Sequence, residues 1–322
     1  MRVLVTGGAG YIGSVVAARL LTGGHEVVIV DDLSTGHADA VPQGAEFHQL
    51  NVAGLDPVLA DWNVEAVLHF AAKSLVGESA EAPALYWRNN VVGTVALLDS
   101  LRAAGVGRIV FSSSAAVYGN AAEQPIHEDA PARPTSPYGA SKLAVDLALA
   151  DYAHAYGLAA VSLRYFNVAG ALHLPGGSYG ERHATETHLV PNALRAAAGA
   201  GELSLFGTDY PTSDGTCVRD YIHVVDLGDA HLRALDAAVA GEHRIVNLGS
   251  GRGYSVREVL ATVAEVVGRD VPVIEQGRRA GDPPVLVASN ALAQEALGWR
   301  PERDLTAMVA DAWRFEELAR SR

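Results

Sequence analysis

Cysteine is nearly absent from this chain, since Cys217 is the only one among 322 residues. One thiol can form neither an internal disulfide nor a cysteine-based zinc site, and it agrees with a reducing cytoplasm. Basic residues are also few: 24 Lys and Arg against 37 Asp and Glu leave a formal net charge of −13. A surface of this charge repels phosphate backbones, so no nucleic-acid partner is expected. A small phosphorylated ligand, held by local amides and a few arginines, is compatible with it.

Long apolar runs are missing as well. No run approaches the roughly 18 uninterrupted apolar residues that span a bilayer, and the apolar start at 1–12 lacks the basic region and cleavage site of a signal peptide. We therefore expect a cytoplasmic protein with no membrane partner. The composition that remains is ordinary for a globular protein, 49% hydrophobic and 19% charged. The length suggests about two domains.

Short β-branched runs alternate with longer helical patterns through the first half of the chain. The runs are almost continuously apolar, as strands covered on both faces must be. Strands and helices in this alternation predict an α/β fold with a doubly wound, Rossmann-type parallel sheet. The expected strands are 3–6, 26–30, 66–70, 108–112 and 159–164, and the expected helices are 12–22, 91–104 and 138–156.

The pattern changes after about residue 170. The stretches 171–180 and 206–216 are rich in residues typical of loops, and long loops in a compact domain are usually functional. We therefore expect one domain over 1–170 and a smaller, loop-rich substrate domain over 171–322. A further buried strand at 244–248 indicates that the chain returns to the first domain around 219–250.

The first expected strand leads into a glycine-rich loop, Gly7-Gly8-Ala9-Gly10-Tyr11-Ile12-Gly13, which opens a helix. Glycines at 7, 10 and 13 allow a tight turn and a close approach of a pyrophosphate to helix N-terminal amides. The second expected strand ends in Asp31-Asp32, 18 residues past Gly13. A carboxylate there, Asp31 above all, accepts hydrogen bonds from the adenine ribose and repels a 2′-phosphate, which favours NAD over NADP. The alternative is a structural glycine turn in a flavodoxin-like domain.

Tyr138 and Lys142 stand four residues apart in an expected helix and so project from one face. A free tyrosine has a pKa of about 10. A neighbouring ammonium and a cationic nicotinamide would lower that pKa by several units and make the phenolate a general base. The run Ser112-Ser113-Ser114 follows the expected strand 108–112, at the edge where doubly wound sheets bind ligands. A serine there can bind a substrate oxygen and relay its proton.

Together these motifs resemble the extended short-chain dehydrogenase/reductase family, from Met1 to about Trp299. Three segments are similar to the nucleotide-sugar epimerases of that family: FSSSAAVYG at 111–119, LRYFN at 163–167 and DYPTSDGTCVRDYIHV at 209–224. The last segment is the most specific. The resemblance implies an enzyme that interconverts UDP-glucose and UDP-galactose. It would do so by transient C4 oxidation with tightly bound NAD, rotation of the 4-keto sugar and return of the hydride.

The resemblance also implies roles for individual residues. Tyr138 is the expected base, aided by Ser114, while Lys142 binds the nicotinamide ribose. Arg219 and Arg279 offer cationic forks to a diphosphate. The positions that match NAD contacts are Gly7, Gly10, Tyr11, Ile12, Gly13, Asp31, Asp32, Ser34, Gly36, Asn51, Val52, Phe70, Ala71, Ala72, Asn89, Tyr138, Lys142 and Phe166. The positions that match UDP-sugar contacts are Ser114, Tyr138, Asn167, Leu189, Phe206, Arg219, Arg279 and Asp282. A homodimer through the helices near Val91 and Tyr138 is implied as well.

Several positions depart from the family pattern. Ala116 replaces a threonine that assists the proton relay, and Ser74 replaces a lysine, which predicts one weaker phosphate contact. Leu286 stands at the gate beside the C2 substituent of the sugar, where some relatives carry tyrosine. A smaller gate makes UDP-N-acetylhexosamines an alternative substrate class.

Two other functions are less favoured. A nucleotide-sugar 4,6-dehydratase would need proton-transferring Asp and Glu side chains where Ala115 and Ala116 stand. A non-enzymatic NAD-sensing regulator would not need the Tyr–Lys pair. Among the 12 histidines, His183 and His188 lie five residues apart without a carboxylate in zinc-site spacing, and H-E-x-x-H is absent. The sequence therefore predicts no metal.

Overall fold

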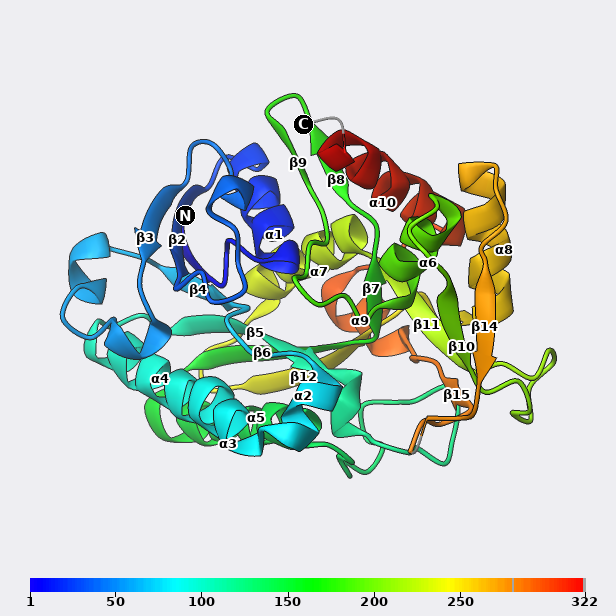
Figure 1. The fold of residues 1–322 in the computed structure, drawn as a ribbon. Coiled ribbons are helices and arrows are strands. Elements are labelled where there is room, and N and C mark those ends of the chain that lie inside the picture. Colours follow the sequence, from blue (N-terminus) through cyan, green and yellow to red (C-terminus); the bar gives the residue numbers. More distant parts are fainter. Residues whose placement is uncertain (280, 321–322) are drawn as a thin grey trace.

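A seven-stranded parallel sheet forms the centre of the computed structural model, which describes residues 1–279 and 281–320 (Figure 1). Its strands are β1 (Arg2–Thr6), β2 (Glu26–Asp31), β3 (Glu46–Gln49), β4 (Ala66–His69), β5 (Arg108–Ser114), β6 (Ala159–Tyr165) and β12 (His243–Leu248). Their spatial order is β12-β6-β5-β4-β1-β2-β3. The order reverses between β1 and β4, so a ligand crevice is expected at the carboxyl ends of these two strands.

Helices cover both faces of this sheet (Figure 1). One face packs on α1 (Tyr11–Thr22), α7 (Val224–Ala237) and α9 (Ala291–Leu297). The other face packs on α4 (Gly93–Ala103) and α5 (Pro137–Tyr156). The apolar strand residues are buried on both sides, as the continuous apolar runs predict. Shorter elements connect these layers: η1 (Ala38–Ala40), η2 (Val52–Gly54), η3 (Leu59–Trp62), α2 (Val76–Glu81), α3 (Pro83–Tyr86), the π-helical η4 (Trp87–Val92) and η5 (Ala115–Val117).

A smaller unit is built from the later part of the chain around its own apolar cluster. Its helices are α6 (Leu189–Ala197), α8 (Val256–Val267) and α10 (Leu305–Arg320). One small sheet joins β7 (Asn167–Ala169), β11 (Val218–His223), β13 (Gly253–Ser255) and β15 (Val285–Leu286), and another joins β10 (Leu203–Phe206) to β14 (Val273–Gln276). No helix among the described residues is long and apolar enough to cross a membrane.

The expected strands and helices are present, and the structure adds others that were not expected. The expected strand at 244–248 is present as β12, which pairs in parallel with β6. The expected loop at 171–180 is wrong, because β8 (Leu172–Leu174) and β9 (Gly177–Tyr179) form a hairpin there. Leu172 and Tyr179 of this hairpin pack against α1, and that contact is not visible in the local composition. The expected helix at 91–104 is α4, which continues directly from the π-helical η4. The helices after residue 156, from α6 to α10, were not expected.

Candidate active site

The glycine-rich loop joins β1 to α1 and lies against the end of β4. Gly7 has a φ of +71°, and a Cβ atom there would lie 2.6 Å from the backbone nitrogen of Ala71. A Cβ atom on Gly13 would lie 2.1 Å from the carbonyl oxygen of Gly7. Only glycine fits these two positions. Helix α1 therefore begins at Tyr11 at the crevice, where its first amides are free to bind an anion.

Asp31 at the end of β2 is fixed beside this loop. Its carboxylate accepts hydrogen bonds from the backbone amides of Ala9, at 3.0 Å, and Leu33, at 2.8 Å. Burial raises the pKa of Asp31, and these two amides oppose that rise. Neighbouring Asp32 accepts hydrogen bonds from the Ser34 amide and the Asn51 side chain, each at 2.9 Å. Two carboxylates thus face the crevice where a ribose would lie.

A cleft of about 860 Å³ opens from the glycine-rich loop across the carboxyl ends of the parallel strands. Every position matched to NAD contacts in the sequence lines this cleft, together with Ser114, Asn167, Leu189 and Leu286. Lys73 and Ser74 line it too. The Lys73 ammonium, 3.4 Å from the Ser34 hydroxyl, supplies the cleft with a cation beside the position where Ser74 replaces the expected lysine.

Three side chains meet where β5 and α5 approach each other. Helix α5 begins close to η5, because a Cβ atom on Gly139 would lie only 2.4 Å from the carbonyl oxygen of Ala116. This places Tyr138 beside Ser114, and their hydroxyl groups are hydrogen-bonded. Lys142 donates a 2.6 Å hydrogen bond to the carbonyl oxygen of Ser112, and its Nζ lies 5.9 Å from the Tyr138 ring centroid.

Burial shifts the pKa values of both Tyr138 and Lys142. Burial raises the pKa of Tyr138, while the hydrogen bond with Ser114 lowers it by less. Burial also lowers the pKa of Lys142 to about 7, against an opposing effect of the Asp146 carboxylate. The expectation that Lys142 and a cationic nicotinamide together lower the pKa of Tyr138 therefore stays a prediction, since burial within the protein alone acts in the opposite direction. The Lys142 ammonium is itself buried and directed at the Ser112 carbonyl oxygen.

A buried polar network supports the cleft, and no sequence motif indicated it. His69 at the end of β4 lies between Thr6, at 2.6 Å from Nδ1, and Thr94, at 2.8 Å from Nε2. The Thr94 hydroxyl donates to the Asn90 carbonyl at 2.6 Å, so it accepts from His69 Nε2. Burial lowers the pKa of His69 to about 3, with a smaller effect of the Lys142 ammonium, so the ring is neutral.

Asn90, in the π-helical η4, connects two walls of the cleft. Its side chain bonds both the amide and the carbonyl of Lys73, at 2.8 and 3.0 Å, and also the Ser141 hydroxyl at 3.0 Å. π-Helical turns inside helices are frequent at functional sites. The insertion turns Asn90 inward beside Asn89, which lines the cleft. The only signal in the sequence that could have identified Asn89 and Asn90 as cleft residues is that they follow β4.

Four of the residues expected to contact the UDP-sugar do not line the cleft: Phe206, Arg219, Arg279 and Asp282. Arg219 pairs with Asp282 at 2.6 Å, and the Arg279 guanidinium lies 4.0 Å from the centroid of the Phe206 ring. The four therefore form two contacting pairs, and none of them lines the 860 Å³ cleft. Arg219 is directly opposite Leu286 in the pairing of β11 with β15, which links these pairs to the cleft wall.

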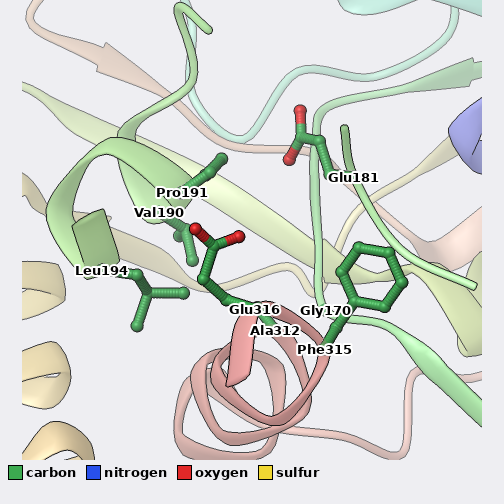
Figure 2. A pocket seen from close by; sticks show the side chains of 8 residues that line it. All are labelled: Gly170, Glu181, Val190, Pro191, Leu194, Ala312, Phe315 and Glu316. Atoms are coloured by element: carbon green, nitrogen blue, oxygen red, sulfur yellow. The ribbon is translucent and has the colours of Figure 1, made fainter. Parts of the chain in front are cut away.

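A second cavity, of about 20 Å³, adjoins the cleft and shares Glu181, Val190 and Pro191 with it. Figure 2 shows Glu181 on the segment after β9, with Phe315 and Glu316 reaching in from α10. A cavity of this volume holds about one water molecule. It is therefore a packing gap beside the cleft and not a substrate site.

A glycine cradle, a ribose-facing carboxylate and a Tyr–Ser–Lys group on one doubly wound sheet define a dinucleotide-dependent enzyme of the Rossmann class. The model of the NAD dependent epimerase/dehydratase family matches residues 3–249. The chain belongs to this family.

Individual relatives cover nearly the whole chain. A UDP-glucose 4-epimerase of Corynebacterium glutamicum is 53% identical over 98% of this chain and 95% of its own. Another from Streptomyces lividans is 53% identical over 97% and 95%. Among solved structures, UDP-glucose 4-epimerase from Stenotrophomonas maltophila with bound NAD and formylated UDP-arabinopyranose superposes with a TM-score of 0.94, at 40% identity and 100% coverage of both chains.

Proposed function

We propose that this chain interconverts UDP-glucose and UDP-galactose with NAD bound. The observation that carries the proposal is the meeting of Tyr138, Ser114 and Lys142 at the carboxyl ends of the sheet, in a cleft of about 860 Å³. That volume is in the range of cofactor and ligand sites. The full-length similarity to UDP-glucose 4-epimerases from several bacteria supports the same activity.

The cleft residues fit NAD. Gly7 and Gly13 leave no room for a side chain where the pyrophosphate would approach α1, and Asp31 faces the adenine ribose. Lys73 offers an ammonium to the phosphates, and Lys142 offers one to the nicotinamide ribose. When bound, NAD supplies the oxidation and the reduction at C4 of the sugar. The other positions matched to NAD contacts, from Tyr11 to Phe166, line the same cleft.

Tyr138 takes the proton of the sugar 4-hydroxyl and later returns it. Ser114 holds the same hydroxyl and passes the proton to the phenolate. Burial raises the pKa of Tyr138 and so favours its protonated form. The base form therefore requires a positive charge near the phenol, which Lys142 and the cationic form of the cofactor together provide. Ala116 has no group that can transfer a proton, so Ser114 alone relays the proton to Tyr138.

The sugar must turn over between the two half-reactions, so its contacts must be weak while those of UDP are strong. Asn167, Leu189 and Leu286 line the sugar end of the cleft and offer one amide and two apolar side chains. Arg219 and Arg279 would hold the diphosphate, with Phe206 and Asp282 beside the nucleoside. Because Arg219 is paired with Asp282 in this structure, UDP binding would exchange part of that ion pair for phosphate contacts.

UDP-N-acetylhexosamines are a second candidate substrate class. Leu286 lines the cleft, and leucine leaves more space beside C2 than tyrosine would. A nucleotide-sugar 4,6-dehydratase is less favoured. Ala115 and Ala116 line the cleft at the serine run and can transfer no proton.

The direct test incubates the purified chain with UDP-galactose, without added NAD, and resolves the products by chromatography. We expect UDP-glucose to form and NAD or NADH to appear in the supernatant after denaturation. The cofactor must stay bound, since its release would strand the ketose. Full activity only with external NAD, and no nucleotide after denaturation, would indicate an ordinary dehydrogenase instead.

We further propose a cytoplasmic homodimer. Exposed apolar side chains gather on α3, η4 and α5, which pack against one another: Leu85, Trp87, Val92, Leu147 and Tyr156. These elements lie together on one side of the sheet (Figure 1). An apolar surface of this kind indicates a partner surface. Light scattering of the purified chain should give twice the mass of 33.7 kDa, and a monomer at all concentrations would contradict the proposal.

A further inference from the structure

Four metal-ligating side chains converge on the segment between β9 and α6. Glu181, His183, Glu186 and His188 each offer one ligand atom, and within the described part of the chain these atoms lie within 4.8 Å of one another. The spacing of the two histidines alone predicted no metal site. The irregular path of this segment adds a carboxylate before each of them, which no sequence template describes.

The carboxylates of this cluster are buried. The Glu186 side chain is 1% exposed and that of Glu181 is 8% exposed. Glu186 is held by the backbone amides of Thr187 and His188, each at 2.9 Å from its Oε1. Two carboxylates at such a site need two positive charges close by. Two protonated imidazoles could provide them, and so could one divalent cation with both imidazoles neutral.

The distances between the ligand atoms leave room for the cation at His183 and Glu186. His183 Nδ1 lies 3.2 Å from Glu181 Oε1 and 3.3 Å from Glu186 Oε2, and His188 Nδ1 lies 3.5 Å from Glu186 Oε1. Charge-assisted hydrogen bonds are shorter, about 2.7–2.9 Å. Ligands roughly 2.0–2.1 Å from a tetrahedral zinc ion are about 3.3–3.4 Å from one another. The two contacts of His183 Nδ1 are close to that edge length, and the 3.5 Å contact of His188 reaches the other oxygen of Glu186. The contact between His188 and Glu181 is shorter and would open around an ion.

We propose that Glu181, His183, Glu186 and His188 bind one divalent transition-metal ion of the zinc type. Two imidazoles and two carboxylates suit such an ion better than Ca²⁺ or Mg²⁺, which prefer sets of oxygen ligands. The two carboxylates balance its charge with both histidines neutral. Tyr11 lies near Glu181 and Glu186. The Tyr11 hydroxyl donates to the Gly170 carbonyl oxygen at 2.6 Å, so Tyr11 is not counted among the metal ligands.

The place of this cluster gives the ion a positioning role. Glu181, His183 and His188 line the main cleft, and Glu181 also closes the small cavity of Figure 2. On the cofactor side, Arg182 pairs with Asp39, with contacts of 2.6 and 3.0 Å, and its carbonyl bonds the His37 ring at 3.0 Å. On the substrate side, α6 begins directly after His188.

An ion here would fix the segment that connects the two halves of the cleft and would slow the loss of the cofactor. This consequence for cofactor retention rests on the proposed function, whereas metal binding itself does not.

The test uses the full chain without an affinity tag, stripped with a chelator and dialysed. Titration calorimetry with Zn²⁺ should show one saturable site per chain, and Co²⁺ should give the visible absorption bands of a tetrahedral complex. Glu186→Gln and His183→Ala should weaken Zn²⁺ binding by at least the roughly 10–100-fold that loss of an outer-shell partner costs. His48→Ala is the matched control, because it removes an imidazole paired with Glu46 at 2.8 Å outside the cluster, and it should bind Zn²⁺ as the wild type does.

Several results would overturn the site. These are no saturable Zn²⁺ binding by the wild type, equal binding by Glu186→Gln, or a Co²⁺ spectrum identical to that of the hydrated ion. The Co²⁺ spectrum of the wild type decides the question even if a variant does not fold. Zinc binding without epimerase activity would refute the proposed function alone. Activity with no zinc site would refute only this inference. NAD release measured with and without Zn²⁺ then tests the positioning role, which predicts slower release with the ion.

Discussion

Replacing Tyr138 by phenylalanine removes one oxygen atom from the centre of the proposed mechanism. The ring keeps its packing, including its edge contact with Tyr86 at 6.4 Å between centroids. The lost hydrogen bond to Ser114 contributes about 0.5–1.5 kcal/mol at most. Ser114 still accepts a bond from the Ala116 amide at 3.1 Å. The free energy of unfolding should therefore change by about 1.5 kcal/mol or less.

The effect on activity should be much larger. General base catalysis contributes about 10²–10⁴-fold, or about 3–5 kcal/mol in activation free energy. We expect Tyr138→Phe to lose that factor in kcat on UDP-galactose, with its NAD content unchanged. Tyr118→Phe is the matched control, because its buried hydroxyl donates to Asn247 at 2.7 Å and does not line the cleft. It should lose stability and keep its activity. Near-wild-type turnover of Tyr138→Phe, at unchanged stability in urea, would refute the assignment of the base.

Three further substitutions test the cofactor loop, the lysine and the sugar gate. Gly13→Ala should purify without NAD, because its Cβ would lie 2.1 Å from the Gly7 carbonyl oxygen. Gly54→Ala is the control and should retain NAD, because a Cβ there meets nothing within 4 Å. Equal NAD content in the two variants would contradict this prediction. Wild-type stability relative to Lys142→Met, measured by urea unfolding without cofactor, should rise from about pH 7 to 10.5. In that window Lys142 binds fewer protons in the folded than in the unfolded chain, so the stability difference rises by at most about 1.4 kcal/mol per pH unit. A stability difference that does not change with pH would refute the lowered pKa of Lys142. Leu286→Tyr should lower kcat/KM for UDP-N-acetylglucosamine more than for UDP-glucose, by the equivalent of about 1–3 kcal/mol in activation free energy. If the variant keeps its activity on both substrates, or if the wild type does not act on the acetamido sugar, Leu286 is not a permissive gate.

The cofactor end of the cleft was predictable from the sequence because one local unit builds it. Gly7, Gly13 and Asp31 lie in a single strand–loop–helix–strand segment whose geometry is set by parallel pairing of β1 with β2. The four-residue spacing of Tyr138 and Lys142 likewise places both on one face of α5. Residues within such a unit have their relative positions fixed by backbone geometry alone.

Contacts between distant segments were not predictable in this way. Asn90 reaches Lys73 and Ser141 only because a π-helical turn displaces it, and the pattern of apolar residues does not encode that turn. The pKa of Tyr138 has the same origin. Sequence spacing supplies the neighbouring ammonium, but the degree of burial depends on how α5 packs against β5 and decides the direction of the shift.

The segment 180–188 bears on how the chain could keep its cofactor while exchanging its substrate. The Arg182–Asp39 pair that ties it to the cofactor side is largely exposed on its aspartate. Such surface pairs typically contribute only about 0–1 kcal/mol. Retention of the cofactor through many catalytic cycles would require a stronger contact from the same segment. Glu186, almost fully buried and held by two backbone amides, can provide it only if its charge is neutralised. The cation that neutralises this cluster, a metal ion in our proposal, would therefore set how firmly the segment is held against the cleft.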